Sequence, residues 1–243
     1  MKAYIQTAAQ HQCSNANSYA AYDGFQQLGW ETVFFRDAAT IADNEPENVV
    51  VGNISDVHAS LRKFNIEVPA PLDYPDSLQA FLGRKIWVST MHAVAKETSF
   101  NVFIKPLHRS KSFTGKLISC ERDLIGCYDY QSDMDILCAE PVHFLAEWRC
   151  FVRYSTILDV RRYRGDWRLH FDPAVIENAL HSYHNAPKAF ALDFGVTDKG
   201  ETLLVEANDG YSLGAYGLPA LDYAKLLSAR WAELTGTRDY ADF

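Results

Sequence analysis

The sequence predicts a mixed α+β and α/β fold, in which a small parallel N-terminal lobe precedes two lobes built on antiparallel sheets. In the first 70 residues, strand and helix patterns alternate, which is typical of a parallel sheet with crossover helices. Beyond residue 98, strand patterns follow one another closely, which favours antiparallel pairing. The predicted domains are residues 1–70 (N-terminal lobe), 71–138 (linker and central lobe) and 139–243 (C-terminal lobe).

The N-terminal lobe is predicted from local periodicity. Residues 15–29 form an expected helix, because Ala21, Phe25 and Leu28 fall on one helical face and a glycine ends the pattern. A second helix is expected after residue 55, with apolar residues at helical spacing up to residue 64. The predicted strands are residues 2–6, 31–35 and 48–52.

The remaining two lobes are predicted mainly as strands. A helix is expected at residues 173–183, because Asp172 precedes Pro173 and both are helix-start residues. The other predicted helices are residues 77–82 and 222–234. The predicted strands are residues 85–88, 100–105, 116–120, 136–139, 147–152, 156–163, 189–194 and 202–206.

Composition limits the classes of function. The 243 residues carry a formal net charge of −8, which argues against a general nucleic-acid binder. The five cysteines include no CxxC pair, so we expect reduced thiols in a cytoplasmic protein rather than disulfides or a zinc site. The polar N-terminus is unlike a signal peptide, and no apolar run approaches the ~20 residues that span a membrane.

An acidic hairpin near the C-terminus carries the strongest chemical signal. Asp193 lies on one predicted strand, residues 197–200 form the turn, and the second strand ends with Glu206 and Asn208. Glu206 and Asn208 are two residues apart, so they share a face that Asp193 can join across the hairpin. Two carboxylates and an amide oxygen suit Mg²⁺ or Mn²⁺. The alternative is a surface hairpin whose acidic residues face solvent.

This hairpin resembles the C-terminal signature of the ATP-grasp superfamily, in the order found in its D-alanine–D-alanine ligase branch. The resemblance implies that Asp193, Glu206 and Asn208 hold two magnesium ions on the phosphates of ATP. It also implies the ATP-grasp fold, with a pre-ATP-grasp lobe at the N-terminus and ATP lying between the antiparallel sheets of the last two lobes.

The resemblance assigns further residues to the nucleotide. Lys105 ends an apolar strand and matches the lysine that contacts the α-phosphate, and Lys116 is a second phosphate candidate after the basic loop 108–115. The alternatives are a solvated lysine and an exposed basic turn. The segment that resembles the adenine-binding hinge between the lobes contains Cys138, Ala139, Glu140 and Val142.

Two arginines are predicted to be catalytic. Residues 147–152 alternate strictly, so Glu147 and Arg149 share one strand face. The resemblance places Arg149 near phosphates or substrate and Glu147 in the nucleotide site, while a structural Glu147–Arg149 ion pair is the alternative. Arg161 is favoured over Arg162 as the arginine that stabilises the transferring phosphate.

The resemblance implies an ATP-dependent carboxylate–amine ligase that forms an acyl phosphate and releases ADP and phosphate. Small-molecule or peptide carboxylates and amines are the implied substrates, and a homodimer is compatible with the family. The glycine-rich segment 209–217 is expected to line the acceptor pocket, and its departure from the D-alanine ligase pattern means that D-alanine is not implied. The alternatives are a small-molecule kinase of the same fold, a non-catalytic ATP-binding module, and an unrelated protein whose hairpin matches by chance.

Overall fold

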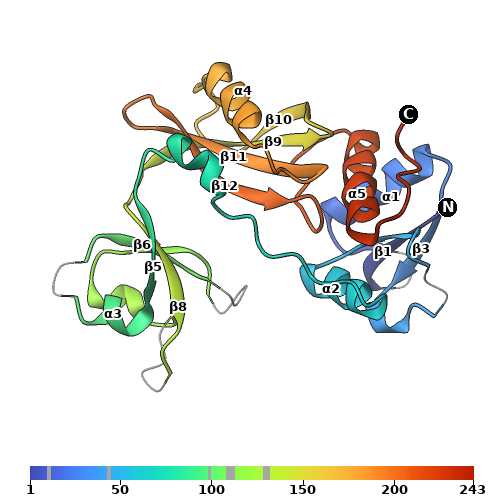
Figure 1. Cartoon of the computed structure of the whole chain (residues 1–243), viewed down its shortest axis with the longest axis horizontal. Helices are drawn as coiled ribbons and strands as arrows, with labels where there is room; N and C mark the ends of the chain where they lie inside the picture. The colour runs from blue at the N-terminus through green and yellow to red at the C-terminus, as the bar shows by residue number, and fades with distance from the viewer. Residues whose placement is uncertain (10–11, 43–44, 98–99, 108–112, 128–131) are drawn as a thin grey trace. The chain divides into compact units, whose positions relative to one another are not determined.

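The computed structural model describes the chain except for residues 10–11, 43–44, 98–99, 108–112 and 128–131 (Figure 1). The chain divides into two compact units. The first unit consists of Met1–Phe81 and Leu145–Phe243, and the second unit is Leu82–Phe144. The sequence predicts domain boundaries at residues 70 and 138 instead, and these boundaries remain a prediction. Among the described residues, no helix has both the length and the apolar character required to cross a bilayer.

The N-terminal lobe of the first unit contains a small parallel sheet, as predicted. Strand β1 lies at its centre and pairs in parallel with β3 and β4, one on each side. The side chain of Asn15 caps the first helix by accepting a hydrogen bond from the Ser18 backbone. The elements are β1 (Lys2–Ala9), β2 (Gln12–Cys13), α1 (Ala16–Gln27), β3 (Glu31–Phe35), η1 (Ala38–Thr40), β4 (Val49–Val51) and α2 (Ile54–Lys63).

The C-terminal part of the first unit is built on a sheet with strand order β10-β9-β11-β12. Every residue of β11 is buried, and α4 and α5 flank this sheet in Figure 1. The free edge of β12 is covered at one point, where the Ala207 backbone donates to Asp73. The elements are η2 (Asp76–Phe81), β9 (Phe144–Arg153), β10 (Thr156–Gly165), α4 (Pro173–Ser182), β11 (Ala189–Thr197), β12 (Thr202–Asp209) and α5 (Ala220–Thr235).

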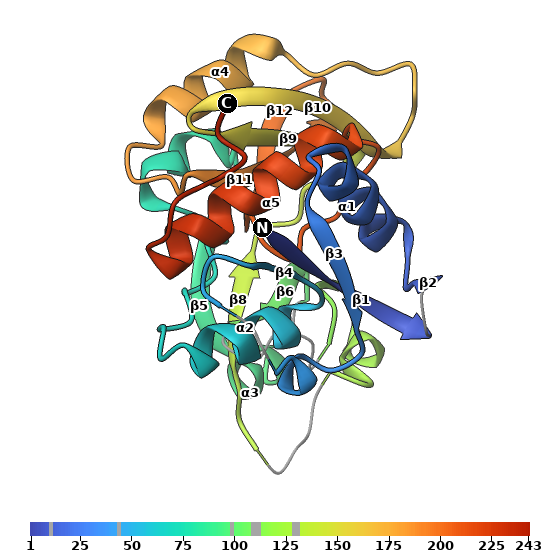
Figure 2. The ribbon, with the colours of Figure 1, turned by 90° about the vertical axis from the view of Figure 1, so that its right-hand side faces the viewer.

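One hydrophobic core joins both ends of the sequence within the first unit. Ile5, Phe25 and Leu61 from the N-terminal lobe belong to the same buried cluster as Tyr223 and Trp231 of α5. Figure 2 shows α1 and α5 side by side, which accounts for this shared core. Residues 1–70 therefore do not bury a core of their own, because α5 supplies part of it.

The crossing of α1 and α5 depends on Gly24. A Cβ atom at this position would overlap the backbone of Ala220 and lie 2.8 Å from the Cβ of Ala224. Helix propensity alone would favour alanine by about 1 kcal/mol, but forcing the helices apart costs more. We therefore expect Gly24→Ala to lower the free energy of unfolding by about 2 kcal/mol, measured by urea denaturation. The exposed Tyr19 is the control, since Tyr19→Ala should leave the midpoint nearly unchanged.

The second unit is an antiparallel sheet with strand order β5-β8-β6-β7, packed on one face against α3. Ile104, Ile118 and Ile136 of the sheet form its core with Met91 and Val94 of the helix. The elements are β5 (Ile86–Thr90), α3 (Met91–Ala95), β6 (Val102–Pro106), β7 (Lys116–Ile118), η3 (Glu121–Leu124) and β8 (Asp135–Ala139).

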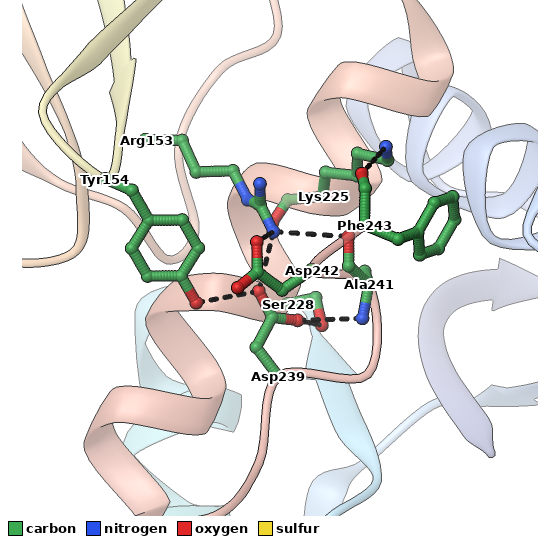
Figure 3. A network of polar contacts seen from close by, with 8 residues as sticks. All are labelled: Arg153, Tyr154, Lys225, Ser228, Asp239, Ala241, Asp242 and Phe243. Atoms are coloured by element: carbon green, nitrogen blue, oxygen red, sulfur yellow. Dashed lines mark hydrogen bonds and ion pairs between the residues drawn. The ribbon is translucent and has the colours of Figure 1, made fainter.

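A polar network fastens the segment after α5 to the end of β9 (Figure 3). The guanidinium of Arg153 donates to Asp239 at 2.8 Å, to Asp242 at 3.2 Å and to the carbonyl of Lys225 at 3.2 Å. Tyr154 donates its hydroxyl to Asp239 at 2.9 Å. The Arg153 side chain is 11% exposed, so these hydrogen bonds are largely shielded from water.

Removal of this arginine should loosen the C-terminal segment. We expect Arg153→Ala to lower the free energy of unfolding by about 2–3 kcal/mol, because hydrogen bonds to charged groups in shielded positions contribute more than exposed ones. Urea denaturation followed by circular dichroism measures the change. Arg168→Ala is the matched control, since its ion pair with Asp166 lies in solvent and should not alter the midpoint. An equal response of both variants would contradict the expectation.

Candidate active site

The three predicted metal ligands lie together on one face of the β11–β12 hairpin. Asp193 pairs with Glu206, and Ala191 pairs with Asn208. Residues directly opposite each other in an antiparallel pair point to the same face, so the three side chains share it. The amide nitrogen of Asn208 donates to Asp193 at 3.1 Å. Their placement agrees with the sequence expectation, and their role as metal ligands remains a prediction.

A β-bulge lies directly beside this face. Asp193 pairs with Glu206 but Phe194 pairs with Leu204, so Val205 is an extra residue of β12. Bulges bend a strand and often lie next to active sites.

The acidic residue after Asn208 does not belong to the metal face. Asp209 follows directly in the strand, so its side chain points to the opposite face. There it accepts two hydrogen bonds of 2.6 Å from Arg230 of α5. The hairpin therefore separates Asp209, which is paired with an arginine, from the Asp193–Glu206–Asn208 face.

Arg149 of β9 is the direct neighbour of Asp193. Its Nε and one amino group donate to the two carboxylate oxygens, each at 2.7 Å. The two side chains are 8% and 3% exposed. The predicted catalytic Arg149 thus lies beside the carboxylates, and its partner is Asp193 rather than Glu147.

Carboxylate groups at this face repel one another, and Arg149 partly offsets that repulsion. Burial raises the pKa of the Asp193 carboxyl, the two hydrogen bonds and charge of Arg149 oppose that shift, and the carboxylates of Glu206 and Glu147 add to it. The pKa of Arg149 is also raised, because the hydrogen bonds and charge of Asp193 outweigh the effect of burial. The carboxylates of Glu206 and Glu147 therefore repel the charge of Asp193. A divalent cation would relieve their repulsion, and oxygen-only donors suit magnesium.

The proposed magnesium site would have only three protein ligands. Among the residues that the structure describes, no group of three or more histidine, cysteine, aspartate or glutamate side chains could hold a metal ion. The proposed set has two carboxylates and one amide, and magnesium usually keeps water and substrate phosphates in its shell. The donor chemistry therefore fits an ion held jointly by protein and nucleotide.

Glu147 lies near this face but is engaged by other side chains. One carboxylate oxygen accepts from the Tyr163 hydroxyl and the other from Arg164, each at 2.7 Å. Burial raises the pKa of Tyr163, and the nearby Asp193 and Glu147 carboxylates raise it further. These contacts give Glu147 a structural function in the sheet, and its predicted role in nucleotide binding remains a prediction.

The strand register resolves which arginine of β10 shares the face of Arg149. Arg161 pairs with Arg149, whereas Arg162 pairs with Trp148 and so points to the other face. Arg161 forms an ion pair of 2.6 Å with Asp159, and its buried Nε has no hydrogen-bond partner in the described part of the chain. Arg161 therefore lies on the strand face of Arg149, and its catalytic role remains a prediction.

The predicted nucleotide residues of the second unit fall on two different faces of its sheet. Lys105 pairs with Leu137, and Phe103 pairs with Ala139, which places these residues on the face away from α3. Cys138 pairs with Ile104, and both belong to the core against α3. Burial raises the pKa of Cys138 to about 11. The side chain of Cys138 is therefore not on the face of Lys105 and Ala139.

Lys116 also lies on the α3 side, because it pairs with Ile104. Its ammonium donates to the Asp123 carbonyl at 2.6 Å, so its hydrogen-bond partner in this structure lies within the second unit. Of the predicted basic loop, residues 108–112 lie outside the described residues.

The hinge segment begins where β8 ends. Glu140 accepts from the Lys85 backbone at 2.8 Å and donates its own backbone N–H to the Lys85 carbonyl at 3.0 Å. Val142 makes no backbone hydrogen bond with the residues that the structure describes. The role of Val142 in binding the base remains a prediction.

The glycine-rich segment after Asn208 contacts the N-terminal lobe within the first unit. Tyr211 and His58 are hydrogen-bonded at 2.8 Å, and Ser212 donates to the Gly52 carbonyl at 2.8 Å. Burial and the charge of Arg62 lower the pKa of His58. The hydroxyl groups of Tyr211 and Ser212 thus attach to the N-terminal lobe the segment that was expected to line the acceptor pocket.

A cavity of about 680 Å³ lies in the N-terminal lobe. None of the predicted site residues lines it, so it does not belong to the carboxylate face. Its lining comes from β1, β3 and the segment after β3: Lys2, Tyr4, Thr7, Glu31, Val33, Phe34, Phe35, Arg36, Thr40, Ile41 and Ala42.

Comparisons with known proteins bear on the family and the fold of this chain. The model of a family described as ATP-grasp domain, R2K clade family 2, matches residues 81–226. No curated protein matches the sequence.

Three solved structures illustrate the likeness of fold. D-alanine–D-alanine ligase from Bacillus anthracis, complexed with ATP, is 15% identical, with a TM-score of 0.58 over 96% of this chain and 95% of that one. The L-amino acid ligase from Bacillus licheniformis is 8% identical, with a TM-score of 0.56 over 96% and 74%. The macrocyclase MdnC from Microcystis aeruginosa, bound with precursor peptide MdnA, is 14% identical, with a TM-score of 0.54 over 93% and 99%. These identities establish the fold alone.

Proposed function

Because this chain belongs to the ATP-grasp domain family of the R2K clade, we propose that it is an ATP-dependent carboxylate–amine ligase. The observation that carries the proposal is the shared face of Asp193, Glu206 and Asn208, with Arg149 held against Asp193. This set combines oxygen ligands for a cation with a guanidinium for phosphate oxygens, which are the two requirements of phosphoryl transfer.

Each residue has a proposed task. Asp193, Glu206 and Asn208 hold magnesium, which when bound neutralises phosphate charge. Asp193 keeps both its hydrogen bonds to Arg149, since each carboxylate oxygen has two lone pairs and can also accept a metal bond. Asn208 would turn its amide so that the oxygen faces the cation, an exchange of similar size and shape.

The basic residues take the remaining charge. One amino group of Arg149 donates no hydrogen bond to the described residues, and this group can donate to a phosphate oxygen. Lys105 is proposed to contact the α-phosphate, and Ala139 and Val142 to border the base. No protein nucleophile is required, because the carboxylate of the substrate attacks the γ-phosphorus and ADP leaves.

In the proposed second half-reaction, an amine attacks the acyl phosphate, the amide forms, and phosphate leaves with the amine proton passing to a base. Small-molecule or peptide carboxylates and amines are the proposed substrates. The known actions of the ligase and macrocyclase structures support this class and do not identify a substrate.

Isotope transfer tests the proposed reaction. The protein would be incubated with magnesium, ATP and mixtures of amino acids or peptides whose carboxyl groups carry ¹⁸O. We expect ADP release that requires an amine, with ¹⁸O appearing in the released phosphate. A stable phosphorylated product that forms without an amine would instead support a kinase and contradict the ligase. Release of phosphate without the label would exclude activation of the carboxylate.

A further inference from the structure

Two tyrosine rings cover the guanidinium of Arg149, and the proposed ligation gives neither a task. The guanidinium carbon lies 4.8 Å from the ring centroid of Tyr216 and 5.9 Å from that of Tyr163. The two rings stack on each other, with centroids 4.8 Å apart and planes 20° apart. Tyr163 is itself fixed, because its hydroxyl donates to Glu147 at 2.7 Å.

The backbone is shaped to bring Tyr216 to this position. Tyr216 has a φ of 45°, a left-handed conformation that is uncommon for residues other than glycine, and Gly217 follows with a φ of 84°. A Cβ at Gly214 would lie 3.2 Å from the Tyr216 ring and 3.6 Å from an amino nitrogen of Arg149. A side chain at Gly214 would therefore press on both groups.

Burial of hydrophobic surface does not account for this arrangement. Tyr216 is 46% exposed, so a large part of its surface remains in water although its backbone adopts a strained conformation. Tyr216 and Gly217 are the central residues of a turn, in which the Leu218 backbone donates to the Ala215 carbonyl at 2.8 Å. This turn carries the half-exposed ring against Arg149 and Tyr163, which points to a role for that contact.

We infer that Tyr216 is a positioning residue: it fixes the guanidinium plane of Arg149 and so sets the direction of the amino group that does not donate to Asp193. Nε and one amino group of Arg149 donate to Asp193, and the other amino group donates no hydrogen bond to the described residues. The ring blocks rotation of the guanidinium out of its present plane. The free amino group then keeps one direction, in which it donates to the transferred phosphoryl group. This inference rests on the proposed function.

The ring also has an electrostatic task. A cation bound by Asp193 and Glu206 would repel Arg149 and weaken its hydrogen bonds to Asp193. The attraction between a guanidinium and an aromatic face depends on the ring and not on the carboxylate. Tyr216 therefore keeps Arg149 in place when the carboxylate charge is shared with a cation.

The first test needs no nucleotide. Exchange of the Arg149 Nε–H with solvent would be measured by NMR in the wild-type protein, Tyr216→Ala and Tyr216→Phe, with Arg149→Lys to identify the resonance. We expect exchange about tenfold faster in Tyr216→Ala and within about twofold of wild type in Tyr216→Phe, because the ring and not the hydroxyl contacts Arg149. Unchanged exchange in a folded Tyr216→Ala protein would overturn the inference.

The second test joins the inference to the phosphoryl group. Calorimetry would compare binding of magnesium–ADP with binding of magnesium–ADP plus aluminium fluoride, which mimics a phosphoryl group in transfer. We expect the affinity of Tyr216→Ala for magnesium–ADP to be within about threefold of the wild-type affinity. The gain in affinity that aluminium fluoride causes should be about tenfold smaller in Tyr216→Ala than in the wild type. Tyr216→Phe should retain that tightening. Full tightening in Tyr216→Ala would overturn the inference.

Failure of the proposed function gives a different result. Absence of magnesium–ADP binding by the folded wild-type protein would remove the ligase proposal and the anion that Arg149 is inferred to meet. The exchange experiment would still decide whether Tyr216 holds the guanidinium. Normal nucleotide binding combined with an unaltered Tyr216→Ala protein would leave the ligase proposal intact and remove only the positioning role.

Discussion

Asp193→Ala is expected to lower the free energy of unfolding by about 3–5 kcal/mol, because it leaves the guanidinium of Arg149 buried without its partner. The two side chains are almost fully excluded from water and share two hydrogen bonds of 2.7 Å. Removal of one member of such a pair costs more than the pair contributes, since the remaining charge stays desolvated. Urea denaturation at neutral pH measures the change.

A double variant separates stability from function. Arg149→Met combined with Asp193→Leu replaces the pair by apolar side chains of similar size, so stability should return to within about 1–2 kcal/mol of wild type. Binding of ATP with magnesium should remain lost, because a metal ligand is absent. A single Asp193→Ala variant as stable as the wild type would contradict the buried ion pair.

Glu206→Gln is expected to weaken magnesium-dependent ATP binding by about 100-fold. The amide keeps the size of the side chain and its place opposite Asp193, but it removes one of only two carboxylates in the proposed metal set. A loss of 100-fold corresponds to about 2.7 kcal/mol. Calorimetric titration with ATP at fixed magnesium measures it, and circular dichroism confirms that the variant folds.

The control for Glu206→Gln lies on the same hairpin. Glu201 is exposed beside the turn, and Glu201→Gln makes the same change of charge away from the proposed site. Its affinity for magnesium–ATP should match that of the wild type. Equal weakening by both variants would assign the effect to net charge, and no weakening by Glu206→Gln would exclude this residue as a metal ligand.

The sequence predicts those parts of the fold and site that depend on local patterns. The three parallel strands of the N-terminal lobe, the hairpin of Asp193 and Glu206, and the helix that begins at Pro173 were each expected and are each observed. Alternation along a strand determines which residues share a face. For that reason Asn208 could be placed with Glu206 without knowledge of the neighbouring strands.

Contacts between distant segments could not be predicted in this way. The partner of Arg149 is Asp193, which lies 44 residues away in the sequence, whereas alternation along the strand suggested only Glu147. Arg161 was favoured over Arg162 from the sequence, but its pairing with Arg149 became visible only in the β9–β10 register. The stacking of Tyr216 on Tyr163 depends on a left-handed backbone conformation, for which the only local signal is the adjacent glycines.

The division into lobes has the same limit. The change of pattern in the sequence predicts the end of a lobe at residue 70, but it does not show that α5 completes the core of that lobe. Likewise, Lys105 was identified from the sequence because it ends an apolar strand. The sequence did not show that Lys116 lies on the other face of the sheet, which follows from its pairing with Ile104.

The most direct test of the central claim is a calorimetric titration of ATP into the wild-type protein, once with magnesium and once with EDTA. It requires no knowledge of the carboxylate or the amine. We predict binding with one nucleotide per chain in magnesium and a large loss of affinity in EDTA. No binding at millimolar ATP by folded protein in magnesium would contradict the account, and the Asp193–Glu206 hairpin would then be a structural element only.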